Sequence, residues 1–364
     1  MKFSIAVLPG DGIGPDVITE ALKVLRVVAK MSGHDVDFRF GLVGGIAISQ
    51  YGTALSLETL KMCQESDAVL LGAVGHPQYD DPQAEVHPED GLLALRKGLG
   101  LFANLRPVKV YPVLVDNTNF KPEVVAGAEF VFVRELTGGL YFGRPKKQWR
   151  TSRGRQAVDS MLYSEQEIER IVRVGFEIAQ GRGKKLISVD KANVLESSRL
   201  WRQIVIEISQ EYPDIELEHM LVDACAMSII QNPGYLDVLV TENTFGDILS
   251  DEASMLAGSM GMLPSASLAG VPKEGIKIFG MYEPIHGSAP SLTGLGIANP
   301  IATITSMAMM LRYSLGLTKE AEAVEAAVEA VLDDGYCTHD IMGEGKIKVG
   351  TGKMGDLIVS KVGG

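Results

Sequence analysis

The chain has 364 residues, 46% of them hydrophobic, so it can bury a large core, and its length predicts two domains. Its formal net charge of -12 argues against nucleic acid as a partner, because phosphate binding usually shows as a basic excess. No charged leader precedes an apolar run and no uninterrupted apolar stretch reaches membrane-spanning length, so we expect a cytoplasmic protein without a membrane partner.

Apolar runs alternate with stretches of helical periodicity along the chain. The apolar runs predict strands at residues 3–8, 68–71, 129–133, 185–189 and 236–241. The periodicity predicts helices at residues 17–29, 164–180, 199–211 and 319–332. Alternating strands and helices indicate an α/β fold with a mainly parallel sheet covered on both faces. Residues 146–155, KKQWRTSRGR, are basic and poor in aliphatic side chains, which predicts an exposed loop or arm.

A glycine-rich loop, PGDGIGP, joins the first predicted strand to the first predicted helix. This arrangement suggests a dinucleotide-binding Rossmann fold, but Gly10, Gly12 and Gly14 give GxGxG rather than GxGxxG. Pro15 also stands at the entry to the helix, and the acidic residues available for a ribose lie beside a polar turn. We therefore expect an α/β fold that is not a Rossmann fold.

Three arginines stand in apolar or tightly turning contexts: Arg96 in GLLALRK, Arg106 in ANLRPVKV and Arg134 in FVRELTGG. A buried guanidinium is costly unless it is paired or meets an anionic ligand bidentately. An acidic protein that binds an anionic substrate must concentrate arginines in one place, and these three are the candidates. The alternative is that each forms a salt bridge with a local acid, such as Glu135 for Arg134.

Two further residues have side chains suited to proton transfer. Lys191 follows a buried strand in SVDKANVLE, where desolvation can lower its pKa and make it a proton acceptor near neutrality. Tyr141, in the segment after Arg134, carries a phenol that can return a proton.

The segment FGDILSDE carries Asp247 and Asp251 four residues apart in a stretch that can be helical. Both carboxylates then project from one helix face, as a hard divalent cation requires of oxygen ligands. Asp223 in LVDACAM is a third carboxylate, set among residues of buried character. Three convergent aspartates predict Mg²⁺ or Mn²⁺, whereas an isolated DxxxD pattern is more often a solvated helix face.

Motifs in a fixed order cover residues 8–300: LPGDGIGP, LLALR, NLRP, RELTGGLYFG, SVDKANVLE, VDA, FGDILSDE, GSMGMLPSASL and EPIHGSAP. Together they resemble the β-decarboxylating dehydrogenases of the isocitrate/isopropylmalate family, above all the members that act on 3-isopropylmalate in leucine biosynthesis. The resemblance implies a discontinuous cofactor-binding domain, residues 1–101 and 258–364, and a domain for dimerisation and substrate, residues 102–257. It also implies a dinucleotide site unlike that of a Rossmann fold.

The resemblance further implies that NAD oxidises a 2-hydroxy acid, which then loses CO₂ to give a 2-oxo acid, here 4-methyl-2-oxopentanoate from 3-isopropylmalate. A metal at Asp223, Asp247 and Asp251 would chelate the C1 carboxylate and the C2 oxygen. Lys191 would take the hydroxyl proton, Tyr141 would protonate C3 of the enol, and the three arginines would hold the two carboxylates. Lys191 and Asp223 would reach into the active site of the other subunit, so a homodimer is the expected catalytic unit.

Substrate choice is implied by the helix that carries Arg96. Leu92 and Leu93 resemble the apolar pair that receives the isopropyl group, with Glu89 and Val194 nearby. Isocitrate relatives place a small polar residue there to meet a third carboxylate, which two leucines would leave desolvated and unpaired. Isocitrate is therefore disfavoured. The alternatives are homoisocitrate, another 3-alkylmalate or tartrate, and a non-catalytic metal- or nucleotide-binding regulatory protein.

The residues implied to bind NAD lie in and around EPIHGSAP: Glu283, His286, Gly287, Ser288, Ala289, Ser291 and Asn299. The glycine-rich turn with Ser288 would approach the diphosphate, while His286 would stack near the adenine and Asn299 would contact its edge. Ser291 stands where NAD-using relatives usually have an aspartate and NADP-using relatives a lysine. It supplies no cation for a 2′-phosphate and no carboxylate to repel one, which predicts a weakened preference for NAD over NADP.

Overall fold

The computed structural model describes residues 1–81, 83–273 and 275–363. Its strands are β1 Lys2–Gly10, β2 Asp35–Phe40, β3 Ala68–Ala73, β4 Ala103–Lys109, β5 Glu129–Glu135, β6 Lys147–Thr151, β7 Gly154–Val158, β8 Lys185–Asp190, β9 Glu216–Leu221, β10 Val238–Thr241, β11 Pro264–Leu268, β12 Gly280–Pro284, β13 Tyr336–Cys337 and β14 Ile347–Lys348. Its α-helices are α1 Gly14–Met31, α2 Gly45–Tyr51, α3 Leu57–Gln64, α4 Pro88–Gly98, α5 Pro122–Val125, α6 Glu165–Gln180, α7 Glu196–Ser209, α8 Val222–Gln231, α9 Asn243–Ser254, α10 Ile301–Tyr313, α11 Thr318–Asp333 and α12 Thr351–Val362.

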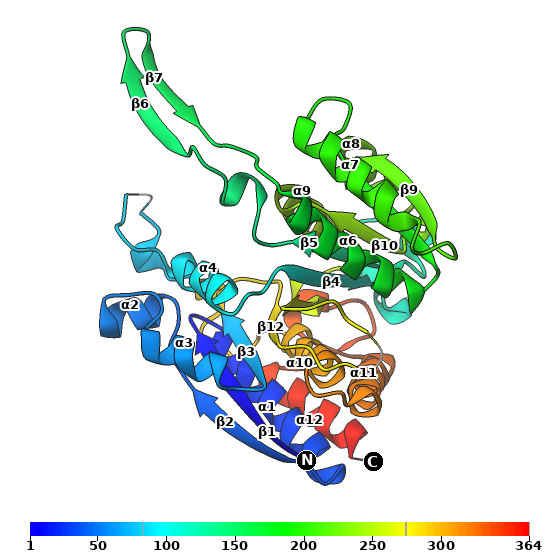
Figure 1. Cartoon of the computed structure of the whole chain (residues 1–364). Helices are drawn as coiled ribbons and strands as arrows, with labels where there is room; N and C mark the ends of the chain where they lie inside the picture. The colour runs from blue at the N-terminus through cyan, green and yellow to red at the C-terminus, as the bar shows by residue number, and fades with distance from the viewer. Residues whose placement is uncertain (82, 274, 364) are drawn as a thin grey trace.

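Ten strands form one sheet in the order β2-β1-β3-β12-β11-β4-β5-β10-β8-β9 (Figure 1). Neighbours are parallel within β2-β1-β3-β12 and within β5-β10-β8-β9. Three antiparallel pairings, β12 with β11, β11 with β4 and β4 with β5, join these two blocks, so the blocks run in opposite directions. The mainly parallel α/β fold is confirmed, and its sheet order is not that of a Rossmann fold.

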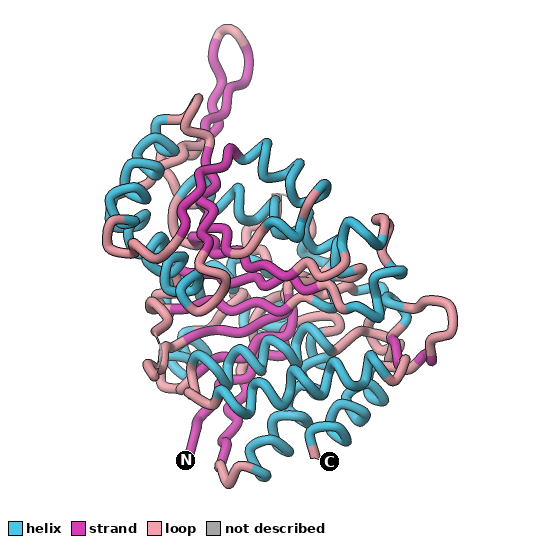
Figure 2. Tube along the Cα trace, turned by 90° about the vertical axis from the view of Figure 1, so that its right-hand side faces the viewer, coloured by secondary structure: helices cyan, strands magenta, loops and turns pink. Residues whose placement is uncertain are grey.

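Helices cover both faces of the sheet (Figures 1 and 2). On one face α1, α10, α11 and α12 pack on one another over the first block, and α6 and α7 pack on the second. On the other face α3 contacts β1, and α9 contacts β4 and β5. Helix α6 begins at a capping box, in which the Ser164 side chain accepts from the Glu167 amide and the Glu167 carboxylate accepts from Ser164. None of the helices in the described ranges is long and apolar enough to cross a membrane.

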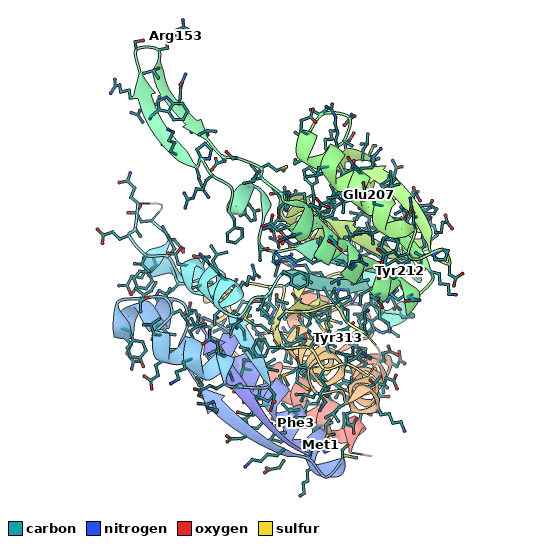
Figure 3. All side chains as sticks on the ribbon, in the orientation of Figure 1. Met1, Phe3, Arg153, Glu207, Tyr212 and Tyr313 are labelled. Atoms are coloured by element: carbon teal, nitrogen blue, oxygen red, sulfur yellow. The ribbon has the colours of Figure 1, made fainter. Side chains whose placement is uncertain are left out.

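The predicted arm is an exposed antiparallel hairpin formed by β6 and β7. It projects from the body of the molecule, with Arg153 at its tip (Figure 3). Its residues form a separate two-stranded sheet, which explains why the segment has polar side chains on both faces.

Five strands of the large sheet were not predicted: β2, β4, β9, β11 and β12. β4 reads ANLRPVK and β9 reads ELEHML, so neither is a continuous apolar run. In β4 the reason is that a row of buried polar side chains lies on one face, where neighbouring strands satisfy it. The strand order also puts β2, β1, β3, β12 and β11, which come from residues 1–101 and 258–364, on one half of the sheet. The domain boundaries themselves stay a prediction.

Candidate active site

A strip of polar side chains crosses the middle of the sheet, on the face that carries α9. Strand side chains alternate between faces, so Asn104 and Arg106 of β4 point the same way. Register places Asn104 beside Arg134 of β5 and beside Ser267 of β11. Ser265 of β11 lies opposite Glu283 of β12. All six side chains are buried, which is unusual for so many polar groups on one sheet face: Asn104, Arg106, Arg134, Ser265, Ser267 and Glu283.

Arg106 and Arg134 reach from this strip to α9. Arg106 Nη1 donates to Ser250 Oγ at 2.7 Å and to Asp251 Oδ1 at 3.1 Å. Arg134 Nη1 forms an ion pair with Asp247. Burial lowers the pKa of Arg106, and burial lowers the pKa of Arg134 to about 10. Both guanidiniums are therefore desolvated cations at neutral pH, the state in which an anionic ligand gains most from binding them.

Glu135 is not the partner of Arg134, contrary to the alternative raised by the sequence. Its carboxylate points to the other face of the sheet, where it accepts from the Thr137 amide at 2.9 Å and from the Gly138 amide at 2.7 Å. Arg170 donates to the same carboxylate at 3.3 Å. Glu135 thus shapes the turn that leads to Tyr141 and leaves Arg134 free to face α9.

Arg96 approaches the strip from α4. Its Nη2 donates to Glu283 Oε1 at 3.1 Å, so these two predicted site residues meet. The Arg96 Nε atom is buried and has no hydrogen-bond partner within the described ranges. Leu92, Leu93 and Glu89 lie on the same helix face as Arg96, because they precede it by four, three and seven residues. Leu93 is 39% exposed, so α4 presents apolar surface next to this arginine.

Asp247 and Asp251 project from one face of α9 toward the arginines, as the spacing predicts. Tyr141 joins them, because its hydroxyl donates to Asp247 Oδ2 at 2.8 Å. Burial and then the contact with Asp247 raise the pKa of Tyr141 to about 12, so the phenol keeps its proton at neutral pH. Burial likewise raises the pKa of Asp251, an effect that Arg106 opposes.

Lys191 and Asp223 form a pair of their own at the ends of β8 and β9. The Lys191 ammonium donates to Asp223, and this hydrogen bond lowers the pKa of the Asp223 carboxyl. Val194, which is 62% exposed, follows Lys191 in the same turn. No group of three or more acidic, histidine or cysteine side chains in the described residues is placed to hold a metal ion. Asp223 of one chain therefore does not complete a site with Asp247 and Asp251 of that chain.

The predicted cofactor segment meets the N-terminal loop at the carboxyl ends of β1, β3 and β12. The Ile13 amide donates to the Ser288 carbonyl at 2.9 Å, and a Cβ on Gly12 would lie 2.0 Å from that carbonyl oxygen. Asp11 ties the loop to its surroundings by accepting from the Gly45 and Ile46 amides at 2.8 Å. The sequence analysis did not predict a role for Asp11, although its place between two glycines is typical of a tight turn that a side chain stabilises.

His286 and Asn299 differ in how free they are to bind a ligand. Burial lowers the pKa of His286, so its ring is neutral at pH 7, and its buried Nε2 has no partner within the described ranges. The Asn299 side chain, by contrast, is engaged: Oδ1 accepts from the Ile301 amide at 3.0 Å and Nδ2 donates to Asp340 Oδ2 at 3.1 Å. Asp340 was not predicted, and it lies in a distant segment that only the fold brings here. Ser291 is exposed in the short 3-10 turn Pro290–Leu292, which follows Ala289.

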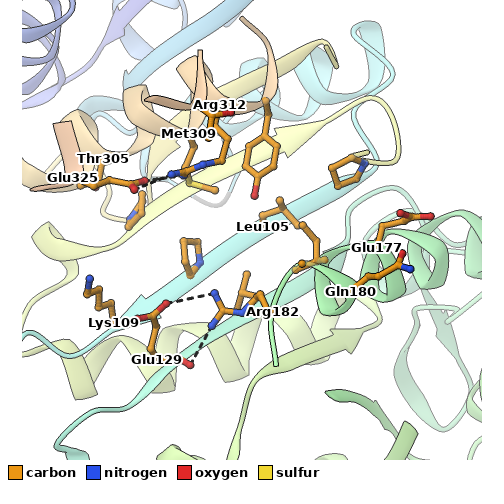
Figure 4. Close-up of a pocket in the computed structure, with 18 of the residues that line it drawn as sticks. Leu105, Lys109, Glu129, Glu177, Gln180, Arg182, Thr305, Met309, Arg312 and Glu325 are labelled. Carbon is orange, nitrogen blue, oxygen red and sulfur yellow. Dashed lines mark hydrogen bonds and ion pairs between the residues drawn. The ribbon is translucent and has the colours of Figure 1, made fainter. Parts of the chain in front are cut away.

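A groove of about 730 Å³ lies on the opposite face of β4, between α6 on one side and α10 and α11 on the other (Figure 4). Leu105 and Pro107 form its floor. Its charged residues pair with one another, as in Arg312 with Glu325 at 2.8 Å, Arg182 with Glu129 at 3.5 Å and Lys273 with Glu177 at 3.6 Å. None of the predicted site residues, all of which are described, lines this groove, so the candidate site is the polar strip.

The chain matches a family model described as isocitrate/isopropylmalate dehydrogenase over residues 4–358. The chain belongs to the isocitrate/isopropylmalate dehydrogenase family. A protein named 3-isopropylmalate dehydrogenase from Dehalococcoides mccartyi is 66% identical, with all of both chains covered. One of the same name from Heyndrickxia coagulans is 55% identical and covers 100% of this chain and 97% of its own. The crystal structure of isocitrate dehydrogenase from Methylococcus capsulatus has 32% identity and a TM-score of 0.84, covering all of both chains.

Membership of this family makes the chain an enzyme, an oxidoreductase of the β-decarboxylating dehydrogenase type. The polar strip fits that chemistry, because the substrates of such enzymes carry carboxylates that desolvated arginines bind.

Proposed function

We propose that this enzyme catalyses the NAD-dependent oxidative decarboxylation of 3-isopropylmalate to 4-methyl-2-oxopentanoate, a step of leucine biosynthesis. The observation that carries the proposal is the gathering of three arginines on one face of the sheet, where Arg106 and Arg134 meet the carboxylates of α9 and Arg96 meets Glu283 of β12. Three neighbouring cations, of which Arg106 and Arg134 are buried, suit a substrate with two carboxylates. The relatives cited above share the name 3-isopropylmalate dehydrogenase, which supports 3-isopropylmalate as that substrate.

A divalent cation fits Asp247 and Asp251. Both side chains supply oxygen donors from one helix face, and both are partly exposed, at 31% and 57%, so an ion can reach them. When bound, Mg²⁺ or Mn²⁺ would stabilise negative charge on the oxygen at C2. Asp223 is the third ligand in the proposal, supplied by the other subunit. Arg106 and Arg134, which contact the same aspartates in the structure, would then turn their free N–H groups to the substrate carboxylates.

The proton transfers are assigned to Lys191 and Tyr141. Tyr141 is protonated and hydrogen-bonded at Asp247, so it can deliver a proton at C3 after CO₂ has left. Lys191 would accept the proton of the C2 hydroxyl. Because Lys191 pairs with Asp223 of its own chain, both residues would enter the neighbouring site together.

A homodimer is therefore part of the proposal. Helices α8 and α9 pack on each other and leave large apolar side chains exposed. These include Met227 at 55%, Ile230 at 44%, Ile248 at 62% and Met255 at 51% exposure. Exposed apolar side chains on two packed helices are costly in water and are typical of a subunit interface. The same two helices carry Asp223 and the aspartates proposed to bind the metal, so a subunit packed on them would bring its residues close to the proposed site.

Leu92 and Leu93 are assigned to the isopropyl group of the substrate. They lie on the Arg96 face of α4, so an alkyl group at C3 could rest on them while Arg96 holds a carboxylate. NAD is assigned to the loops around Ser288 and His286, whose buried Nε2 still lacks a partner in the described part of the chain. The cofactor domain of residues 1–101 and 258–364, the substrate domain of residues 102–257 and a cytoplasmic location complete the proposal.

The test is a set of steady-state rates for the purified enzyme with NAD and Mn²⁺ on 3-isopropylmalate, isocitrate, homoisocitrate, tartrate and other 3-alkylmalates. We expect the highest kcat/KM with 3-isopropylmalate and loss of turnover in excess chelator, restored by Mn²⁺. Asp251→Asn should raise the Mn²⁺ concentration needed for half-maximal rate. Full turnover in chelator would exclude the metal assignment, and a higher kcat/KM with another acid would replace the substrate.

A further inference from the structure

We propose that two buried asparagines, Asn104 and Asn243, are positioning residues that orient the substrate arginines without neutralising them. Each presents its amide oxygen to the Nε edge of one guanidinium: Asn104 to Arg106 and Asn243 to Arg134. Neither was among the residues that the sequence predicted for the site. The inference rests on the proposed function, because it assumes that these arginines bind the substrate's carboxylates.

Asn104 lies on β4, fully buried. Its Oδ1 accepts from Arg106 Nε at 2.8 Å. Its Nδ2 donates to Ser265 Oγ at 2.8 Å and to Ser267 Oγ at 3.2 Å, both on the adjacent strand β11. Because Nε can only donate, the amide oxygen must face the arginine and the NH₂ group must face the serines. The amide therefore has one orientation, and the guanidinium that it holds has one as well.

Asn243 plays the same part for Arg134 from the first turn of α9. Its Oδ1 accepts from Arg134 Nε at 3.1 Å and from Nη2 at 2.8 Å. Its Nδ2 donates to the Gly138 carbonyl at 3.1 Å, and its backbone amide donates to the buried Tyr163 hydroxyl at 2.9 Å. The side chain is only 1% exposed. It thus links the arginine to α9 and to the turn that carries Tyr141.

The neutral amide is the important chemical feature. A carboxylate in either place would form a desolvated ion pair with the guanidinium and lower the positive potential that attracts the substrate. An amide satisfies the Nε edge without adding a negative charge to those of Asp247 and Asp251, and the Nη edge is turned toward α9 and the substrate. Arg96 differs at the Nε edge, because its Nε atom has no hydrogen-bond partner in the described residues, whereas at the Nη edge all three arginines face a carboxylate. Arg106 and Arg134 are buried more deeply, and in each the Nε edge is held by an uncharged acceptor.

This inference can be tested by substitutions that keep the shape of the asparagine side chain and add a negative charge. Asn104→Asp keeps an acceptor at Arg106 Nε, and the hydroxyls of Ser265 and Ser267 can turn to donate to the new carboxylate, while the donor to the Ala266 carbonyl at 3.3 Å is lost. Asn243→Asp keeps the acceptor at Arg134 but loses the donor to the Gly138 carbonyl, and an acid in the first turn of α9 is favourable for the helix. Asn104→Leu removes the acceptor and adds no charge. Asn119→Asp, at an exposed loop position before α5, is the control for one added negative charge.

With 3-isopropylmalate as substrate, we expect each Asp variant to raise KM about tenfold or more while kcat falls less, since attraction of the substrate is lost but the acceptor that orients the guanidinium is kept. Asn104→Leu should mainly lower kcat, because Arg106 keeps its charge but loses its orientation. Asn119→Asp should behave as the wild type. A solely structural role would instead lower the unfolding midpoint and the active fraction in the Asp and Leu variants alike, without this split between KM and kcat.

Malonate provides a readout that needs no turnover. As an inert dicarboxylate it should raise the thermal unfolding midpoint of the wild type and of Asn119→Asp, and raise it much less in the two Asp variants. Wild-type KM and a wild-type malonate shift in Asn243→Asp would overturn the inference, whether or not the Asn104 variants fold. If the wild type does not oxidise 3-isopropylmalate but malonate still distinguishes the Asp variants, the proposed function fails and the role of the asparagines stands.

Discussion

At the scale of single residues, burial decides what each polar group can do. Arg106 and Arg134 are cations in a nearly dry environment, so their remaining N–H groups favour an anion. Tyr141 keeps its proton because burial and Asp247 both disfavour the phenolate. These two properties, an anion-binding cation and a phenol that stays protonated, are what a decarboxylating dehydrogenase requires on either side of a substrate.

Lys191 and Tyr141 should therefore give different defects. Lys191→Ala removes the proposed proton acceptor and should abolish oxidation, visible as loss of NADH formation by at least about a hundredfold. Tyr141→Phe removes only the phenolic proton and should mainly slow the protonation that follows CO₂ loss. Single-turnover measurements of NADH and of product separate the two steps. A Lys191→Ala enzyme with the wild-type rate and the wild-type acidic limb of the pH profile would show that another group is the base.

A second prediction for a single residue concerns Ser291 and the preference of the enzyme for NAD or NADP. Ser291 is exposed next to Gly287 and Ala289 and offers neither a cation for a 2′-phosphate nor a carboxylate to repel one. We expect kcat/KM to favour NAD, and Ser291→Asp to widen the ratio of NAD to NADP. Ser360→Asp, at an exposed position on α12, is a control that adds the same charge elsewhere. Wild-type values that favour NADP would refute the assignment of this turn.

At the scale of elements, α9 does more than carry two aspartates. Glu242 caps its N-terminus by accepting from the Thr244 and Phe245 amides, and Tyr163 donates to the same carboxylate at 3.1 Å. The helix then packs so closely on the sheet that only glycine fits at residue 246. A Cβ there would lie 2.3 Å from Thr241 Oγ1 and 2.7 Å from Arg134 Cγ. The distance from Asp247 to Arg134 depends on this close packing.

Gly246→Ala should accordingly destabilise the protein, by about 1–3 kcal/mol, even though alanine is the better helix former. The helix must move away from Arg134, so we also expect KM for 3-isopropylmalate to rise. Gly352→Ala on α12 is the matched control, because the nearest atom that its new Cβ would meet, Glu20 Oε1 of α1, is 3.9 Å away. Denaturant unfolding of both variants measures the difference. Equal stability of Gly246→Ala and the wild type would show that the packing in this region can relax at no cost.

At the scale of the whole molecule, the sheet contains two blocks of parallel strands that run in opposite directions. The antiparallel strands β11 and β4 join the two blocks. Ligands bind beyond the carboxyl ends of parallel strands. The two blocks therefore provide two separate groups of loops. We assign the loops after β1, β3 and β12 to the cofactor, and the residues after β5, β8 and β10 to the substrate. Within the described residues of one chain, Asp223 does not form a three-ligand group with Asp247 and Asp251, so the proposed metal site needs a second chain.

Mixed dimers test whether the active site is shared. When inactive Lys191→Ala and inactive Asp247→Asn chains exchange subunits, one site of each heterodimer carries both changes and the other carries neither. Random exchange should restore about a quarter of the wild-type activity, because half the dimers are mixed and each has one intact site. Each variant alone, taken through the same exchange, is the control. Exchanged dimers that recover no activity would exclude a site built from two chains.

The sequence by itself determined the features that repeat locally or lie within one short segment. The alternation of apolar runs and helical periods predicted β1, β3, β5, β8 and α1 near their observed positions, because burial imposes period 2 or 3.6 on neighbouring residues. The DxxxD spacing placed Asp247 and Asp251 on one helix face for the same reason. The ordered motifs identified the family.

Only the tertiary structure decided what depends on partners distant in sequence. β4, β11 and β12 have too many polar or small residues to be recognised locally, and they are strands because their neighbours satisfy the polar strip. Asn104 meets Ser265, and Arg134 meets Asn243, across more than a hundred residues of chain. No local pattern marks either asparagine, since the need for an uncharged acceptor arises only when the arginine beside it is buried.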